Sequence, residues 1–293
     1  MNRSRTWLVM PAAALGVAAL VAGAALMVHV SPPVPQKDDP NPTAIPTNSR
    51  SNGPVEARDV TVPVYFLGDT TSGARLFREF RTYQGVVGWS KLRVAVTGGV
   101  LGDTTDPDYR TAFPKGTTAR VSQDGDTVIV DLLSNNDLTS ELRAGEGDMG
   151  VQAIVYTVDA VLQKTSPVRF LINGSSADRV LGVDTSQLVT RATADSVQAP
   201  VWVIEPGNQA GVSSPFEVTG TAATFEANVV WELKAGNRVL RNGFATAKEC
   251  CTTSPYSFRV AAPPGNYTLV VHDTDESGQG RGINSDTREI TVR

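Results

Sequence analysis

The chain has 293 residues and a formal net charge of −4, with 26 Lys and Arg against 30 Asp and Glu. So mild an acidic balance suggests neither nucleic acid nor an anionic lipid surface as a partner. Valine, threonine, glycine and alanine dominate, and long Leu/Glu/Lys-rich stretches are absent, which favours strands and turns over helical bundles.

Residues 1–30 are predicted to be an N-terminal membrane anchor or signal peptide. Arg3 and Arg5 precede an uncharged run, Thr6 to Val30, that is long enough to cross a bilayer as a single transmembrane helix. The two arginines would stay on the cytoplasmic side, which places the rest of the chain outside. Ala22-Gly23-Ala24 offers a cleavage site, but the apolar run continues past it. A retained anchor is therefore favoured, with secretion after cleavage as the alternative.

A Pro-rich linker is predicted over residues 31–59. Its prolines cannot continue a helix or lie in the centre of a sheet, and its polar residues bury too little apolar surface to offset chain entropy. The prolines are Pro32, Pro33, Pro35, Pro40, Pro42, Pro46 and Pro54. We expect a semi-extended spacer that lifts the folded regions away from the membrane.

The first folded region is predicted over residues 60–189 and begins with two strands. Val60–Leu67 alternates between two faces, and Pro63 places this strand at a sheet edge or a bulge, because proline cannot donate a hydrogen bond to the ladder. Gly68-Asp69 is expected to begin a loop, and Leu76–Tyr83 to form the second strand.

A helix is then predicted over Trp89–Val96, with Gly98-Gly99 as its stop. Strands Thr118–Gln123 and Thr127–Leu133 follow. Asp124-Gly125 joins them, and this dipeptide suits a tight hairpin turn.

The strongest helical pattern follows Gly150, where apolar residues recur at spacings of three and four. They are Val151, Ile154, Val155, Val158, Val161 and Leu162. Pro167 lies beyond the helix end, and Asn173-Gly174 closes the strand Val168–Ile172 that comes next. Strands mixed with two helices predict an α+β domain with a mixed sheet.

Three blocks of this region resemble the GerMN domain of sporulation and spore-germination proteins. They read VTVPVYFLGD…LFREFR, AFPKGTTARVSQDGDTVIVDL and VQAIVYTVDAVLQKTSPVRFLING, and they occur in that order over most of the region. The stretch Val86–Asp106 departs from the Ala/Leu-rich helix of that family because it is rich in glycine. The resemblance implies an interaction module rather than a catalytic domain.

Residues 200–293 are predicted to be all-β. About seven short strands separated by turn residues indicate a β-sandwich of immunoglobulin type. Val239 and Leu240 precede the pair Asn242-Gly243. The blocks VWVIEPGNQAGVSSPFEVTGTAATFEANVVWEL and PPGNYTLVVHDTDESGQG are similar to the immunoglobulin-like domain of bacterial spore-germination proteins. That domain often follows a GerMN domain, so each resemblance supports the other.

No catalytic residue, cofactor or metal centre is predicted, and the chain is not expected to be an enzyme. Of its two histidines, His29 lies in or beside the membrane segment and His272 in a predicted hairpin, with no nucleophile elbow in the sequence. A zinc site needs a cluster of ligands at a spacing that the sequence does not offer. Glu217 and Glu226 are too isolated to form a glycosidase pair.

Cys250 and Cys251 are the only cysteines, and they are adjacent. In an oxidising compartment they can form a disulfide within one loop, stay reduced, or cross-link two chains. A redox switch is the more specific hypothesis, because a disulfide between adjacent cysteines distorts the backbone and is more easily reduced. A local loop disulfide is favoured, since a single pair is a weak signal.

A weak calcium candidate lies at Asp273, Asp275 and Ser277. These residues place oxygen ligands at alternate positions ahead of Gly278, as in a calcium-binding loop. The twelfth position, where such loops carry a bidentate glutamate, is Asn284, and no helix is predicted to enter the loop. A solvated acidic hairpin tip is therefore the favoured interpretation.

Two classes of function remain open. The first is a non-catalytic interaction or scaffold protein of the bacterial cell envelope, a single-pass membrane protein with a cytoplasmic N-terminus and both domains outside. Its partners would be other envelope proteins or a cell-wall polymer, bound through sheet edges and loops. The second is a polymer-binding protein or hydrolase that acts on peptidoglycan or polysaccharide, which would need carboxylates or metal ligands in one pocket.

Overall fold

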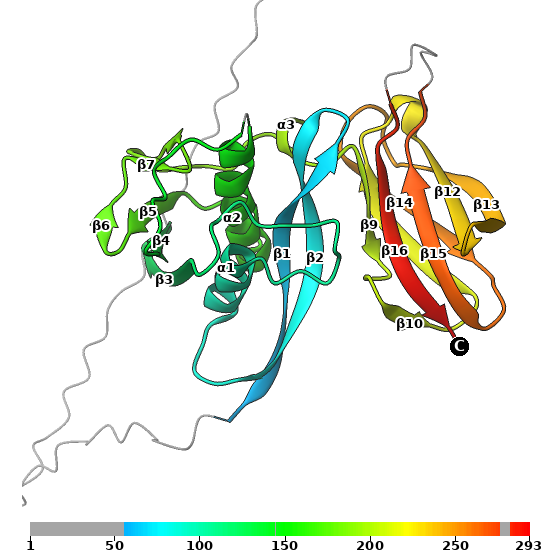
Figure 1. The fold of residues 1–293 in the computed structure, drawn as a ribbon, viewed down its shortest axis with the longest axis horizontal. Coiled ribbons are helices and arrows are strands. Elements are labelled where there is room, and N and C mark those ends of the chain that lie inside the picture. The colour runs from blue at the N-terminus through cyan, green and yellow to red at the C-terminus, as the bar shows by residue number, and fades with distance from the viewer. Residues whose placement is uncertain (1–55, 144, 276–281) are drawn as a thin grey trace, which may run out of the picture. The chain divides into compact units, whose positions relative to one another are not determined.

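The computed structural model describes residues 56–143, 145–275 and 282–293. The predicted membrane segment, residues 1–30, and the linker as far as residue 55 lie outside the described residues. Within the described ranges, no helix is long and apolar enough to cross a membrane. Gly53–Arg293 form one compact unit, in which an α+β part precedes an all-β part (Figure 1).

A long β-hairpin opens the first domain. β1 (Arg58–Thr70) pairs antiparallel with β2 (Gly73–Val86) in a two-stranded sheet, and Pro63 lies in β1 as an edge strand allows. The strand begins two residues before the predicted domain start at residue 60. The loop predicted at Gly68-Asp69 is wrong, because these residues pair with β2 and the turn lies at Thr71-Ser72.

The first helix is longer than predicted. α1 (Lys91–Leu101) begins after its cap Ser90 and ends at Gly102, which adopts the left-handed conformation with φ 70°. The stop predicted at Gly98-Gly99 is wrong, since both glycines lie inside the helix. A Cβ atom at Gly98 would collide with the hydroxyl of Tyr83, so this glycine allows α1 to pack closely against β2.

The second helix, α2 (Glu146–Leu162), begins one turn before the predicted start after Gly150. Its first turn carries Glu146 and Asp148, whose negative charges are favourable at a helix N-terminus. It ends where the apolar pattern ends, at Gln163 in the left-handed conformation.

A four-stranded mixed sheet forms the other side of this domain. In spatial order its strands are β3 (Thr118–Asp124), β4 (Thr127–Leu133), β5 (Val168–Ile172) and β6 (Ser175–Ser176). The pairing of β4 with β5 is parallel, because α2 carries the chain back between them. Both helices lie between this sheet and the hairpin (Figure 1). The prediction of a mixed-sheet domain with few helices is confirmed.

A connecting segment follows, with short elements. They are β7 (Arg179–Val180), β8 (Val183–Asp184) and α3 (Ala194–Val197).

The second domain consists of two packed sheets, which confirms the β-rich immunoglobulin-like prediction. The larger sheet has, in spatial order, β10 (Ala210–Val212), β16 (Ser285–Val292), β15 (Gly265–His272), β12 (Asn228–Ala235) and β13 (Arg238–Thr246). The smaller sheet has β14 (Ser254–Val260), β11 (Phe216–Ala222) and β9 (Val201–Glu205). Fully buried residues of both sheets, such as Val203, Val218 and Leu269, form the core between them.

The pair Asn242-Gly243 does not turn the chain. β13 runs through both residues, and the turn lies at Gly236-Asn237. A Cβ atom at Gly243 would lie 2.7 Å from Cζ2 of Trp231, so this glycine leaves room for the indole ring.

Candidate functional site

The two domains meet at a buried cluster centred on Arg288 of β16. Its Nη1 donates hydrogen bonds to Asp106 Oδ2 at 2.6 Å and Asp286 Oδ1 at 2.9 Å. Its Nη2 donates to the hydroxyl of Tyr109 at 2.8 Å and to the backbone oxygen of Val203 at 2.7 Å. Asp106 and Tyr109 belong to the loop between α1 and β3, so the guanidinium group bonds both domains. We call Arg288, Asp286, Asp106 and Tyr109 the junction cluster.

Every charge in the junction cluster has a partner. Asp286 accepts hydrogen bonds from the Tyr109 hydroxyl at 2.9 Å and from the backbone N–H of Val203 at 2.7 Å. The side chains of Arg288, Asp106 and Asp286 are each 2% exposed. Buried charges are tolerated when they are paired and hydrogen-bonded in this way.

Burial also changes the acidity of these groups. Burial raises the pKa of Asp106 to about 6, although the positive charge of Arg288 opposes the shift. Burial raises the pKa of Asp286 and of Tyr109 as well. Burial alone would lower the pKa of Arg288, but the adjacent Asp286 raises it, so the guanidinium stays charged.

The loop that carries Asp106 is held by the first domain itself. Glu79 of β2 accepts hydrogen bonds from the backbone N–H groups of Thr105 at 3.1 Å and Asp106 at 2.9 Å, and from the Thr105 hydroxyl at 2.9 Å. The buried carboxylate of Glu79 therefore fixes the loop that presents Asp106 to Arg288.

Further contacts surround the junction cluster. The ring of Trp202 in β9 is 1% exposed and lies edge-on to Phe77 of β2, with centroids 6.5 Å apart. Asn284 Oδ1 accepts hydrogen bonds from the backbone N–H of Thr71 at 3.0 Å and from its hydroxyl at 2.9 Å. The junction therefore combines apolar packing with charged and neutral hydrogen bonds.

Sequence reasoning missed the junction cluster, although β16 carries a signal for it. Asp286, Arg288, Ile290 and Val292 alternate along the strand and share one buried face. An acid and a base on the face that carries Ile290 and Val292 mark a buried ion pair, because period-two positions point to one side of a strand. The partners Asp106 and Tyr109 carry no comparable local pattern.

The histidine and glutamate candidates do not belong to the junction cluster. His272 ends β15, and its Nδ1 lies 2.7 Å from the backbone oxygen of Asp273, which is a local strand-end contact. Glu217 lies in β11 and Glu226 in a short 3₁₀ turn, and both are exposed. His29 lies outside the described residues.

The calcium candidate is assembled differently from a calcium loop. Asp273 accepts hydrogen bonds from the backbone N–H and the side-chain Nδ2 of Asn284, both at 2.8 Å. Asn284, the twelfth position of the motif, thus bridges Asp273 to Thr71. Ser277 lies outside the described residues. Within the described ranges, no group of three or more His, Cys, Asp or Glu residues could hold a metal ion.

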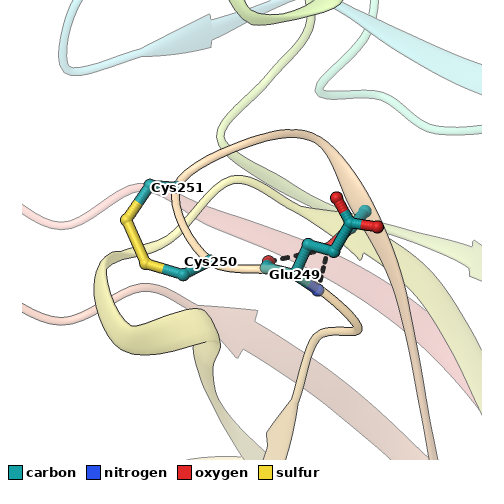
Figure 2. The surroundings of a disulfide bond; sticks show 4 residues. Glu249, Cys250 and Cys251 are labelled. Carbon is teal, nitrogen blue, oxygen red and sulfur yellow. Dashed lines mark hydrogen bonds between the residues drawn. A yellow bond between two sulfur atoms is a disulfide. The ribbon is translucent and has the colours of Figure 1, made fainter. Parts of the chain in front are cut away.

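Cys250 and Cys251 form a disulfide within one exposed loop, as Figure 2 shows. The loop is closed by hydrogen bonds between Glu249 and Ser254, at 3.0 Å and 2.9 Å. Asp195 of α3 accepts a hydrogen bond from the backbone N–H of Thr253 at 2.9 Å. The disulfide loop therefore contacts the segment that connects the two domains.

An open apolar groove lies at the far end of the hairpin from its turn. Its volume is about 350 Å³, and its apolar lining comes from Val86 at the end of β2, Val87 and Trp89 after it, and Val94 and Leu101 on α1. We call it the hairpin groove.

Two family matches cover most of the described residues. Residues 63–178 match the family described as "Sporulation and spore germination", and residues 200–279 match the "Immunoglobulin-like domain of bacterial spore germination". No curated protein sequence matches the chain.

Similarity to solved structures is distant. The tandem GerMN domains of the sporulation protein GerM from Bacillus subtilis are 15% identical over 69% of this chain and 61% of that chain, with a TM-score of 0.36. The match therefore spans less than two thirds of that structure. The fibronectin(III)-like modules of Clostridium thermocellum CbhA are 16% identical over 32% of this chain and 95% of that chain, with a TM-score of 0.21.

The domain organisation and the family matches agree with each other. The α+β domain coincides with the first match and the β-sandwich with the second. The chain therefore carries a domain of the sporulation and spore germination family, followed by an immunoglobulin-like domain of bacterial spore germination.

Proposed function

We propose that this chain is a non-catalytic interaction or scaffold protein of the bacterial cell envelope. Its N-terminal segment would hold it at the membrane, with both domains outside, where they bind other envelope proteins. The uncharged run Thr6 to Val30 behind Arg3 and Arg5 supports the anchor, and the Pro-rich segment supports a spacer.

The junction cluster is the observation that carries this proposal. A set of acids, a tyrosine and an arginine with shifted pKa values is the kind of cluster that often marks a catalytic site. Here the charged side chains are 2% exposed, and their polar atoms bond to each other and to Val203. A pocket of about 260 Å³ is lined by Tyr109 and Asp286 of the cluster together with Asp69 and Asp108. Both oxygens of Asp286 are already hydrogen-bonded within the junction, to Tyr109, Arg288 and Val203, which supports a role in holding the two domains together.

A fixed junction suits a scaffold. Domains within a chain move relative to one another unless their interface is large and well packed. Here a buried ion network and the packing of Trp202 on Phe77 would hold the outer surfaces of the two domains at a constant separation. A partner that touches both domains would then bind without first ordering them.

The test combines cross-linking with an activity assay. A photoreactive amino acid is placed at Phe244, which is 74% exposed on β13, and at Trp89, which is 38% exposed beside the hairpin groove. We expect discrete adducts with envelope proteins in living cells, and no release of soluble fragments when the full chain is incubated with purified cell wall. Fragment release that is lost in Glu217→Gln or Glu226→Gln would support the hydrolase alternative instead.

A further inference from the structure

We propose that the hairpin groove binds an extended peptide segment of a partner protein, in which apolar side chains alternate with carboxylates. The inference rests on the proposed function, because it names the partner chemistry of that interaction protein.

The lining of the hairpin groove is apolar and open to solvent. Val87 is 51% exposed, Trp89 38% and Leu101 55%. Exposed apolar residues gathered in one hollow mark an interaction site, and tryptophan is among the residues that contribute most to binding energy. The groove volume of about 350 Å³ lies within the usual range of about 300–1,000 Å³ for ligand sites. A sugar polymer could stack on a tryptophan ring, but Arg93 already lies over a face of Trp89, so a peptide with apolar side chains is favoured.

Positive charges at the rim select the charge of the peptide. The Cζ atom of Arg93 lies 3.7 Å from the ring centroid of Trp89, and its Nε is buried without a hydrogen-bond partner. Lys91 begins α1, and Arg58 lies opposite Val86 in the hairpin. Among the described residues, none of these three cations forms a salt bridge.

The stacked arginine is well suited to a carboxylate. A guanidinium group held over an indole ring can still direct its two Nη groups to a carboxylate in a two-point contact. Asp59, on the same strand end as Arg58, accepts a hydrogen bond from the backbone N–H of Gly85 at 3.2 Å and so is engaged within the hairpin. Asp59 and Glu56 keep their negative charges, so the three cations Arg58, Lys91 and Arg93 leave this end of the hairpin positive by one charge.

The hairpin also favours an extended peptide. From Phe77 to Val86, β1 is the only strand that pairs with β2 among the described residues, so the other edge of β2 is open there. The end of β2 also lines the hairpin groove. A peptide strand can add to an open edge of this kind, with main-chain hydrogen bonds for affinity and alternate side chains for specificity.

The probe is a fluorescein-labelled decapeptide of alternating leucine and glutamate, titrated with the full chain in neutral-lipid nanodiscs and followed by anisotropy. Two control peptides replace glutamate by lysine or leucine by serine. We expect the Leu-Glu peptide to bind at least about tenfold more tightly than either control, a difference equivalent to about 1.4 kcal/mol. Arg93→Glu and Leu101→Asp should each weaken binding about tenfold or more. The matched exposed variants Arg238→Glu and Phe244→Asp should leave binding unchanged.

Each other outcome overturns the inference. Equal binding of the Ser-Glu peptide would indicate a site for anionic polymers, and equal binding of the Leu-Lys peptide would remove the role of the rim charges. Circular dichroism checks the fold of each variant. If Leu101→Asp is unfolded, Val87→Asp, in the segment after β2, takes its place as the test of the apolar lining. If peptides fail to bind while cellular cross-links persist in Arg93→Glu, the groove is not the binding site but the proposed function stands. Absence of cellular cross-links in the unchanged chain would remove the proposed function as well.

Discussion

Arg288 Nη1 lies 2.6 Å from Asp106 Oδ2, and this hydrogen bond joins two domains through residues that are 182 positions apart in the chain. Both side chains are buried, so neither charge has water as an alternative partner. The removal of one partner therefore costs more than the bond itself contributes.

Arg288→Met should destabilise the chain by about 3–5 kcal/mol, because it leaves Asp106 and Asp286 buried without their cation. Chemical denaturation followed by tryptophan fluorescence measures the loss. Arg238→Met, at an exposed position of β13, is the matched control and should change the free energy of unfolding by less than about 0.5 kcal/mol. A similar small effect in both variants would show that the junction cluster contributes little to stability.

The raised pKa of Asp106 predicts a pH dependence. Burial raises its pKa to about 6 in the folded chain, above the ordinary value of 3.8, so the folded state binds this proton more tightly than the unfolded state. The contribution of Asp106 to the free energy of unfolding is therefore fully present below about pH 4 and is lost as the pH rises through about 6.

Asp106→Asn removes that titration. We expect the decline in stability between about pH 4 and 6 to be shallower in Asp106→Asn than in the wild type. Denaturation midpoints at half-unit pH steps provide the comparison. An unchanged slope would mean that Asp106 titrates in the folded state as it does in the unfolded chain.

Gly98→Ala should destabilise the first domain by about 1–3 kcal/mol, because the new methyl group has no room beside the Tyr83 hydroxyl. Alanine is the better helix former, so intrinsic propensity alone predicts the opposite sign. Gly207→Ala serves as the control, since a Cβ atom there meets nothing within 4 Å. Stabilisation by Gly98→Ala would contradict the close packing of α1 on β2.

Loss of the disulfide should have little effect on stability. Cys250 and Cys251 are adjacent, so their bond closes almost no chain, and hydrogen bonds between Glu249 and Ser254 close the loop without it. The double variant Cys250→Ser/Cys251→Ser should unfold within about 0.5 kcal/mol of the wild type. Asp195→Ala, which removes the acceptor for Thr253, should cost more. The reverse order in thermal unfolding would give the disulfide a structural role.

Local sequence patterns predicted where strands and helices occur but misplaced several of their ends. Gly68 lies within β1 and Gly98 within α1, although they were predicted to begin a loop and to stop the helix, and Gly243 lies within β13. At Gly98 and Gly243 a side chain distant in sequence occupies the space of a Cβ atom. A single sequence does not distinguish a glycine needed for close packing from one needed for a turn, because both require only the absence of a side chain.

The junction cluster was beyond prediction for a different reason. Alternation in β16 places Asp286 and Arg288 on the buried face, but their partners Asp106 and Tyr109 come from a loop without periodicity. The hairpin groove likewise depends on how α1 packs against the end of β2, a tertiary relationship that local pattern does not encode. The family resemblance, in contrast, rests on whole blocks of sequence and was confirmed over both domains.

The most direct test of the account is a distance measurement across the domain junction. Spin labels at Arg120→Cys in β3 and Arg241→Cys in β13, both exposed positions, are introduced into the Cys250→Ser/Cys251→Ser background. If the junction cluster fixes two binding domains as one scaffold, double electron–electron resonance will show one narrow distance population that broadens in Arg288→Met. A broad distribution without the Arg288 change, or a narrow one that survives it, would contradict the account.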